Sequence, residues 1–263
     1  MIRRILLACG AEWTKYSRMP LPYLGVAVII GLSVATVFIY PVRSDGMSDF
    51  GYIGHAVPSA LNLAGFLILV GYTATLVSGE VASGTIRTVL VRPIARHEYL
   101  SAKLLNGLAY SLLLAFVSVL TAWICALSLG ELTGIAFGEE LMFTTAEVYG
   151  AMALAALLNL APHFATVAYA LFVSTITRRP AAAIGLAAGT WLLIDYVKHP
   201  LGISAFLFTT YLDQAWIVFQ DRCNALDTPF FPEAIYGLLI CFAWFVVFGL
   251  ASVFVFGRRS FGP

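Results

Sequence analysis

The sequence predicts an all-α integral membrane protein with six transmembrane helices. The first observation is composition: of 263 residues, 60% are hydrophobic and only 11% are charged, whereas soluble domains carry roughly 25% charged residues. The mean hydropathy is +0.90. The second observation is six long apolar stretches, and the third is a strong asymmetry of Lys and Arg between their connections. We expect a single transmembrane domain over residues 1–263.

Each of the six stretches approaches or exceeds the 20 or so residues that a helix needs to cross a bilayer. The third and fourth are long enough to tilt or to continue beyond the membrane. The predicted spans are about 21–41, 57–78, 101–129, 148–176, 181–198 and 233–256.

The positive residues set the orientation. If the N-terminus is cytoplasmic, three cations fall outside, namely Arg43, Lys198 and Arg222. The cytoplasmic side then receives Arg3, Arg4, Lys15, Arg18, Arg87, Arg92, Arg96, Lys103, Arg178, Arg179, Arg258 and Arg259. The positive-inside rule therefore predicts a multi-pass protein of the plasma (inner) membrane with both termini cytoplasmic.

The first 19 residues have the periodicity of a helix that lies in the membrane interface. At 100° per residue, one face of this helix carries Ile2, Ile5, Leu6, Cys9, Trp13 and Tyr16. The opposite side carries Arg3, Arg4, Lys15 and Arg18, as expected of an interfacial amphipathic helix. Pro20 and Pro22 then end this helix and turn the chain into the first span.

The segment 79–100, between the second and third spans, is more than a basic loop. Ile86, Val89 and Leu90 follow Gly84-Thr85 and share one helical face. This spacing predicts a short amphipathic helix at the membrane surface, which the membrane or a partner protein would cover. Pro93 marks a turn, after which a second helix enters the bilayer.

This segment resembles the coupling region of ABC-2 type ABC transporter permeases. The resemblance rests on an acid, Gly-Thr, an apolar and a basic residue, then Pro, Arg and Lys, in this order: Glu80, Gly84, Thr85, Ile86, Arg87, Pro93, Arg96 and Lys103. It implies that Glu80 to Arg96, including Val89 and Leu90, couple the permease to separate ATPase subunits. ATP and Mg would be bound there, and this chain would bind no cofactor. It also implies a second permease copy, in a homodimer or a heterodimer.

The outer segment 199–232 is dense in apolar and aromatic side chains, including Phe206, Tyr211, Trp216 and Phe219. This composition predicts short helices at the outer interface or dipping into it. ABC-2 permeases have re-entrant helices at this position, and an interfacial elbow helix at the N-terminus. Cys223 is expected here as an exposed thiol without a disulfide partner.

Four polar residues lie in or near the spans, where such groups are costly and often functional. Asn159 and His163 are one turn apart around Pro162; they could line a pathway or relay a proton, or could form a hydrogen-bonded pair at a kink. Asp195 and Lys198 are spaced i, i+3 at the outer end of the fifth span, either as a gate or as a local ion pair.

The fifth span also has small residues at Ala181, Gly185 and Gly189. This spacing lets two helices approach closely. The stripe is therefore expected either in the interface between two permease copies or in packing within the chain.

The sequence contains no Gly-x-x-x-x-Gly-Lys-Ser/Thr loop and no His-Glu-x-x-His or Gly-x-Ser-x-Gly motif. We therefore expect a transport subunit rather than an enzyme, and the net charge of +1 gives no reason to expect nucleic acid. The leading hypothesis is the permease of an ATP-driven exporter. The alternative is a secondary transporter or channel that uses Asn159, His163 and Asp195.

Overall fold

The computed structural model describes the chain except for residues 1, 41, 43–48, 91–94, 138–139 and 260–263. Among the described residues, six helical segments are long and apolar enough to cross a membrane, which agrees with the predicted number of spans. They are α2 (Pro20–Ala35, extended by a 3₁₀ turn to Phe38), Asp49–Ala82, α6 (Arg96–Leu129), α7 (Thr145–Ile176), α8 (Pro180–Val197) and α10 (Glu233–Arg258). The protein is a multi-pass membrane protein.

The second spanning segment begins at Asp49, before the predicted residue 57. It consists of α3 (Asp49–Pro58), a π-helical stretch η2 (Ser59–Gly65) and α4 (Phe66–Ala82). Pro58 has no N–H to donate to the Gly54 carbonyl, so the regular α-helical ladder is interrupted there. Gln220 of a later helix donates to that freed carbonyl oxygen at 2.6 Å. The interruption is thus compensated by a tertiary hydrogen bond.

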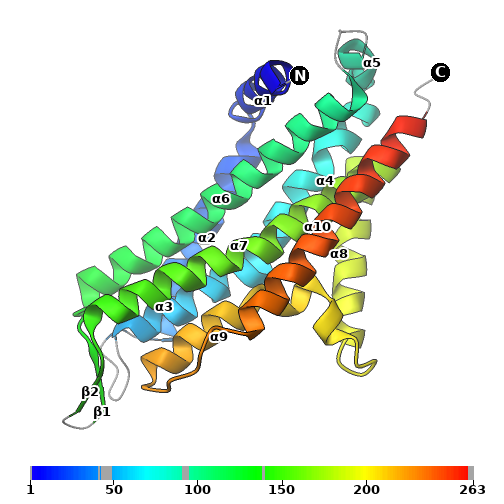
Figure 1. Cartoon of the computed structure of the whole chain (residues 1–263). Helices are drawn as coiled ribbons and strands as arrows, with labels where there is room; N and C mark the ends of the chain where they lie inside the picture. The colour runs from blue at the N-terminus through cyan, green and yellow to red at the C-terminus, as the bar shows by residue number, and fades with distance from the viewer. Residues whose placement is uncertain (1, 41, 43–48, 91–94, 138–139, 260–263) are drawn as a thin grey trace.

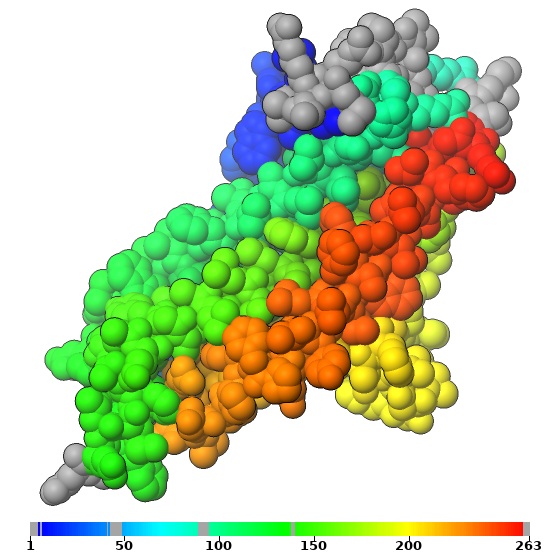
Figure 2. All heavy atoms as spheres, viewed as in Figure 1, coloured from blue at the N-terminus to red at the C-terminus, as the bar shows by residue number. Residues whose placement is uncertain are grey.

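The helices form a bundle around α7 (Figure 1). α7 packs against α4, α6, α8 and α10. In the apolar 18-residue stretch of α7 that is suited to cross the membrane, 61% of the residues are buried, compared with 11% in the corresponding stretch of α10. Figure 2 shows α6, α7 and α10 side by side on one face of the molecule. The core therefore follows α7 and the Asp49–Ala82 helix, while α2, α8 and α10 leave long apolar surfaces exposed.

One end of the bundle carries the N-terminal helix α1 (Ile2–Tyr16), the short helix α5 (Thr85–Leu90) and the end of α10 (Figure 1). We call it the terminal end. The opposite, hairpin end carries two antiparallel strands, β1 (Ile135–Phe137) and β2 (Glu140–Phe143). These strands correct the all-α prediction: the described residues are mostly but not entirely helical.

The segment after α8 turns back toward the bundle through the 3₁₀ turns Ser204–Phe206 and Phe208–Thr210, and continues as α9 (Tyr211–Cys223). α9 packs on α3 and α7, and Trp216 and Phe219 are fully buried. Short helices were expected here, but Cys223 is not the exposed thiol that was expected. It is 4% exposed, because it lies on the face of α9 that joins the core.

Candidate functional site

The candidate site lies at the terminal end, where α4 gives way to α5. Gly84 has a φ of +72°, in the left-handed region that glycine adopts at helix ends without steric cost. It therefore ends α4, and the chain restarts as α5 at Thr85. The Ser83 and Thr85 hydroxyl oxygens lie 2.9 Å apart across this turn. The predicted short helix is thus present in the structure.

Glu80 lies in the last turn of α4. Its carboxylate is 4% exposed and accepts hydrogen bonds from Lys15 of α1 at 2.5 Å and from Lys103 of α6 at 2.6 Å. Tyr99 of α6 donates to its second oxygen at 2.7 Å. One buried acid therefore joins three helices.

Lys103 completes this group. Its side chain is fully buried, and its Nζ also lies 2.5 Å from Glu12 of α1. The Tyr16 and Tyr99 rings lie 5.5 and 5.2 Å from the ammonium, within range of a cation–π interaction. Two carboxylates thus face two ammonium groups, which is the pairing that buried charges require. We call Glu12, Lys15, Glu80, Tyr99 and Lys103 the charge junction.

The charge junction corrects two expectations. Lys103 was counted among the cations of a cytoplasmic connection but is inside the bundle, and Glu12 was not identified at all. Burial, together with the Glu12 and Glu80 carboxylates, raises the pKa of Tyr16 above its ordinary value. Tyr16 therefore remains a neutral phenol beside the junction.

Ile86 anchors α5 to the bundle. It is 2% exposed and belongs to a buried apolar cluster whose members come from five helices: Val77, Ile86, Tyr99, Leu100, Leu171 and Phe256. The chain itself therefore covers the apolar face at Ile86, where the sequence left only membrane or a partner as candidates. The side chains of Val89 and Leu90, and Pro93 altogether, lie outside the described residues. Thr85 and Arg87 are exposed.

Arg96 joins the start of α6 to the end of α10. Its guanidinium donates to the carbonyl oxygens of Phe256, Gly257 and Arg259 at 3.0, 2.9 and 2.9 Å. These are carbonyls that the end of a helix leaves without intrahelical partners. Arg259 in turn donates to the Thr175 and Thr177 carbonyls at the end of α7. Arg96, expected only as part of the coupling region, therefore also caps the end of α10.

Asn159 and His163 are both buried, at 2% exposure. The Asn159 amide donates to the Leu212 carbonyl of α9 at 2.6 Å, and His163 Nδ1 lies 2.8 Å from the Asn159 carbonyl oxygen. The pair thus joins α7 to α9, which agrees better with a packing role than with an open pathway.

Asp195 and Lys198 form the local ion pair that their spacing suggested, with Nζ 2.5 Å from the carboxylate oxygen. Asp195 lies in the last turn of α8, whereas Asn159 is near the middle of α7. The structure shows no contact between Asp195 and the pair of Asn159 and His163. These are the residues that the alternative, a secondary transporter or channel, would use together.

The stripe of Ala181, Gly185 and Gly189 is exposed along α8. Among the described residues, no atom outside the neighbouring backbone of α8 lies within 4 Å of a Cβ added at Gly185 or Gly189. Packing within the chain, one of the two expectations for this stripe, is therefore not observed. The stripe faces away from the bundle.

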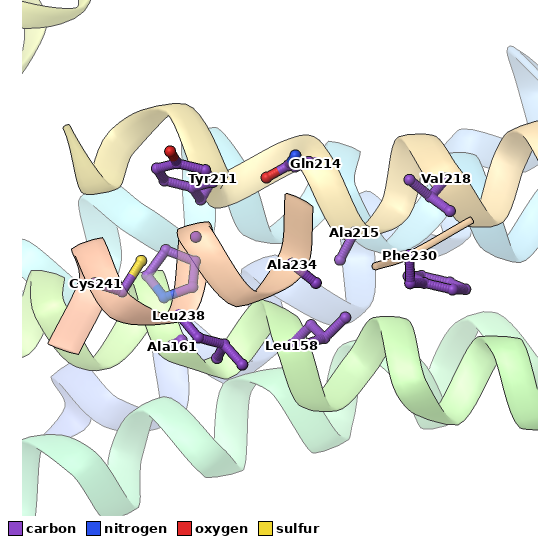
Figure 3. Close-up of a pocket in the computed structure, with 12 residues that line it drawn as sticks. Leu158, Ala161, Tyr211, Gln214, Ala215, Val218, Phe230, Ala234, Leu238 and Cys241 are labelled. Carbon is purple, nitrogen blue, oxygen red and sulfur yellow. The ribbon is translucent and has the colours of Figure 1, made fainter. Parts of the chain in front are cut away.

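A small cavity lies between α7, α9 and α10 (Figure 3). Its lining includes Pro162 of α7, Tyr211 and Gln214 of α9, and Cys241 of α10, and its volume is about 30 Å³. That volume suits a few water molecules rather than a transported solute. Among the described residues, no group of three His, Cys, Asp or Glu side chains is placed to hold a metal ion.

A comparison with known protein families gives a match over most of the chain. The model of the family described as "ABC-2 family transporter protein" matches residues 8–189, which is more than half of the chain. This range includes the charge junction, α5 and the first part of α8, up to Gly189. A comparison with curated proteins found no match.

Proposed function

The chain belongs to the ABC-2 family of transporter proteins, and on this premise we propose that it is the permease subunit of an ATP-driven exporter. Separate ATPase subunits would bind ATP and Mg and hydrolyse ATP. This chain would provide the membrane path and the mechanical connection to them. It would act as a transport subunit, without a catalytic residue of its own.

The observation that carries the proposal is the double anchoring of α5. On one side, Gly84 separates α5 from Glu80 by a single tight turn, and Glu80 is tied to α1 and α6. On the other side, Ile86 packs against residues of α4, α6, α7 and α10. A force applied to the exposed side of α5 would therefore move several spanning helices together instead of bending one loop.

The proposed orientation places the terminal end in the cytoplasm of a cell whose plasma (inner) membrane holds the protein. The clustering of α1, α5 and the end of α10 at one end (Figure 1), together with the positive charges of these segments, supports it. The ATPase would then meet the exposed residues of α5, including Arg87. α1 would lie in the headgroup layer as an elbow helix.

We further propose that two permease copies assemble, as a homodimer or a heterodimer, with the transport path between them. The small-residue stripe of α8 supports this arrangement because a second helix could approach it without meeting atoms of this chain. The resemblance to ABC-2 permeases implies outward transport.

Co-purification tests the proposal. The wild-type chain, purified from native membranes, should bring an ATPase with it, and ATP turnover should appear only in that complex. Val89→Asp should abolish this association while the permease still inserts, because a charge without a partner in a closed interface is costly. Arg87→Ala should have a milder effect, since a rim charge contributes little. A Val89→Asp protein with a full complement of ATPase and normal transport would refute the role of α5.

A further inference from the structure

An apolar groove runs along α10 on the side that faces α7. Its volume is about 590 Å³, and its walls are Ala161 and Phe164 of α7 and one face of α10 between Ile235 and Phe245. It adjoins the small cavity of Figure 3, with which it shares Ala161 and part of the α10 wall. An apolar cavity of about 150 Å³ already holds a benzene molecule, so this groove has room for a long hydrocarbon chain.

The groove is as long as one membrane leaflet is deep. α7 and α10 are both long and apolar enough to cross a membrane. Between Ile235 and Phe245 the groove follows about 15 Å of α10, which is half of the roughly 30 Å hydrocarbon core. It begins two residues after Glu233, where α10 starts, and ends near the middle of that helix. The acyl chains of the leaflet on the hairpin side occupy the same depth.

Packing at both ends holds the groove open. Toward the terminal end, the Phe248 ring of α10 lies 5.2 Å from the Tyr169 ring and 5.9 Å from the Phe172 ring of α7, between centroids. At the start of α10, Gly237 packs so tightly on Tyr211 of α9 that an added Cβ would lie 2.7 Å from a ring carbon. A small shift of α10 therefore cannot close the groove without losing these contacts.

The surroundings of the groove decide what fills it. Water is a poor occupant, because a buried water molecule needs roughly two to four polar partners and the lining is apolar apart from the Cys241 thiol. An empty groove would leave its walls without dispersion contacts. The groove opens on a surface of α10 where Leu239 is 60% and Phe242 is 66% exposed. No described residue of α8, whose stripe is proposed for a second copy, lines it. Lipid is therefore the occupant that both the chemistry and the position favour.

We propose that this groove is a lipid-binding site, which holds one acyl chain of a lipid from the hairpin-side leaflet between α7 and α10. Because no charged side chain among the described residues lines the groove, the site recognises the chain rather than the headgroup. The bound chain completes the packing of the first half of α10 on the middle of α7. The inference goes beyond the proposed function, since it requires neither an ATPase nor a second permease copy.

Photolabelling tests the site. The protein, with whatever co-purifies, is reconstituted in phosphatidylglycerol nanodiscs that contain some phosphatidylcholine with a diazirine in one acyl chain. Mass spectrometry then identifies the labelled residues. Phe242 should be labelled severalfold more than Tyr236 and Val247. These two residues are 65% and 53% exposed, lie on either side of Phe242 along α10 and do not line the groove. The same photoreactive chain on phosphatidylglycerol should give the same pattern.

A filled groove provides the second measurement. Ala161→Phe places a phenyl ring in the groove and should reduce the labelling of Phe242 to that of Tyr236. The matched control Ala243→Phe adds the same ring at an exposed position of α10 outside the groove, and should leave the labelling of Phe242 unchanged.

Three results would overturn the inference. Equal labelling of Phe242, Tyr236 and Val247 in the wild-type protein would mean that only exchanging lipid covers α10, and this comparison does not depend on how a variant folds. Wild-type labelling of Phe242 in the Ala161→Phe protein would place the chain outside the groove. Labelling of Phe242 in the monomer but not in the dimer would assign the groove to a second copy.

Discussion

Replacing Lys103 with Met measures what the charge junction contributes. The substitution keeps a long unbranched side chain but removes a fully buried ammonium that lies 2.5 Å from Glu12 and 2.6 Å from Glu80. Glu80 would then depend on Lys15, whose side chain is 39% exposed, and Glu12 would lose its cation. Removing one partner of a buried pair costs about 3–5 kcal/mol, because the remaining charge stays buried.

For a chain of this size, that loss corresponds to a fall in the melting temperature on the order of 10 °C. The assay is thermal unfolding of the purified protein in a fixed detergent. Lys198→Met is the matched control, since its partner Asp195 is 42% exposed, and a pair of that kind contributes about 1 kcal/mol or less. If Lys103→Met melts no lower than Lys198→Met, the charge junction does not hold α1, α4 and α6 together.

The other predictions concern topology and assembly. Cys223 should resist an impermeant maleimide, because burial raises the pKa of its thiol to about 12. A cysteine introduced by Asp227→Cys, where the native side chain is 78% exposed, should be labelled from outside, and one introduced by Arg178→Cys only from inside. The reverse labelling pattern would invert the proposed orientation. Gly185→Leu should leave the monomer folded but reduce the dimer fraction in detergent. Gly107→Leu, in contrast, should lower the melting temperature, because a Cβ at position 107 would lie 2.6 Å from a Val167 methyl carbon. A Gly185→Leu protein that still dimerises fully would show that the small-residue stripe of α8 is not an interface.

The spanning helices could be predicted from the sequence because length and hydropathy are local properties. The ion pair of Asp195 and Lys198 was equally accessible, since i, i+3 neighbours meet on any helix. The start of the second spanning helix was not. The helix α3 (Asp49–Pro58) continues into the spanning helix despite Pro58, partly because Gln220, far along the chain, donates a hydrogen bond to the Gly54 carbonyl that Pro58 leaves free. Such long-range compensation leaves no local pattern.

The short helix after Gly84 was predicted in position, but the contacts around Glu80 were not. Glu12 and Lys103 face each other only after α1 folds back on α6, and periodicity placed the polar side of α1 toward water. A local signal existed for Arg96: a cation in the first turn of a helix opposes that helix's own dipole. A cation in that position is expected to interact with a group outside its own helix, and here Arg96 donates to the carbonyl oxygens at the end of α10.

Site-specific photo-crosslinking tests the central claim, that α5 is the contact between this chain and an ATPase. A photoreactive residue replaces Thr88, which is exposed on α5, and a second one replaces Glu140 on the hairpin as the control. In native membranes, the probe at Thr88 should crosslink to an ATPase subunit and the probe at Glu140 should not. Crosslinks from Thr88 to lipid alone, or ATPase crosslinks from Glu140, would contradict the account.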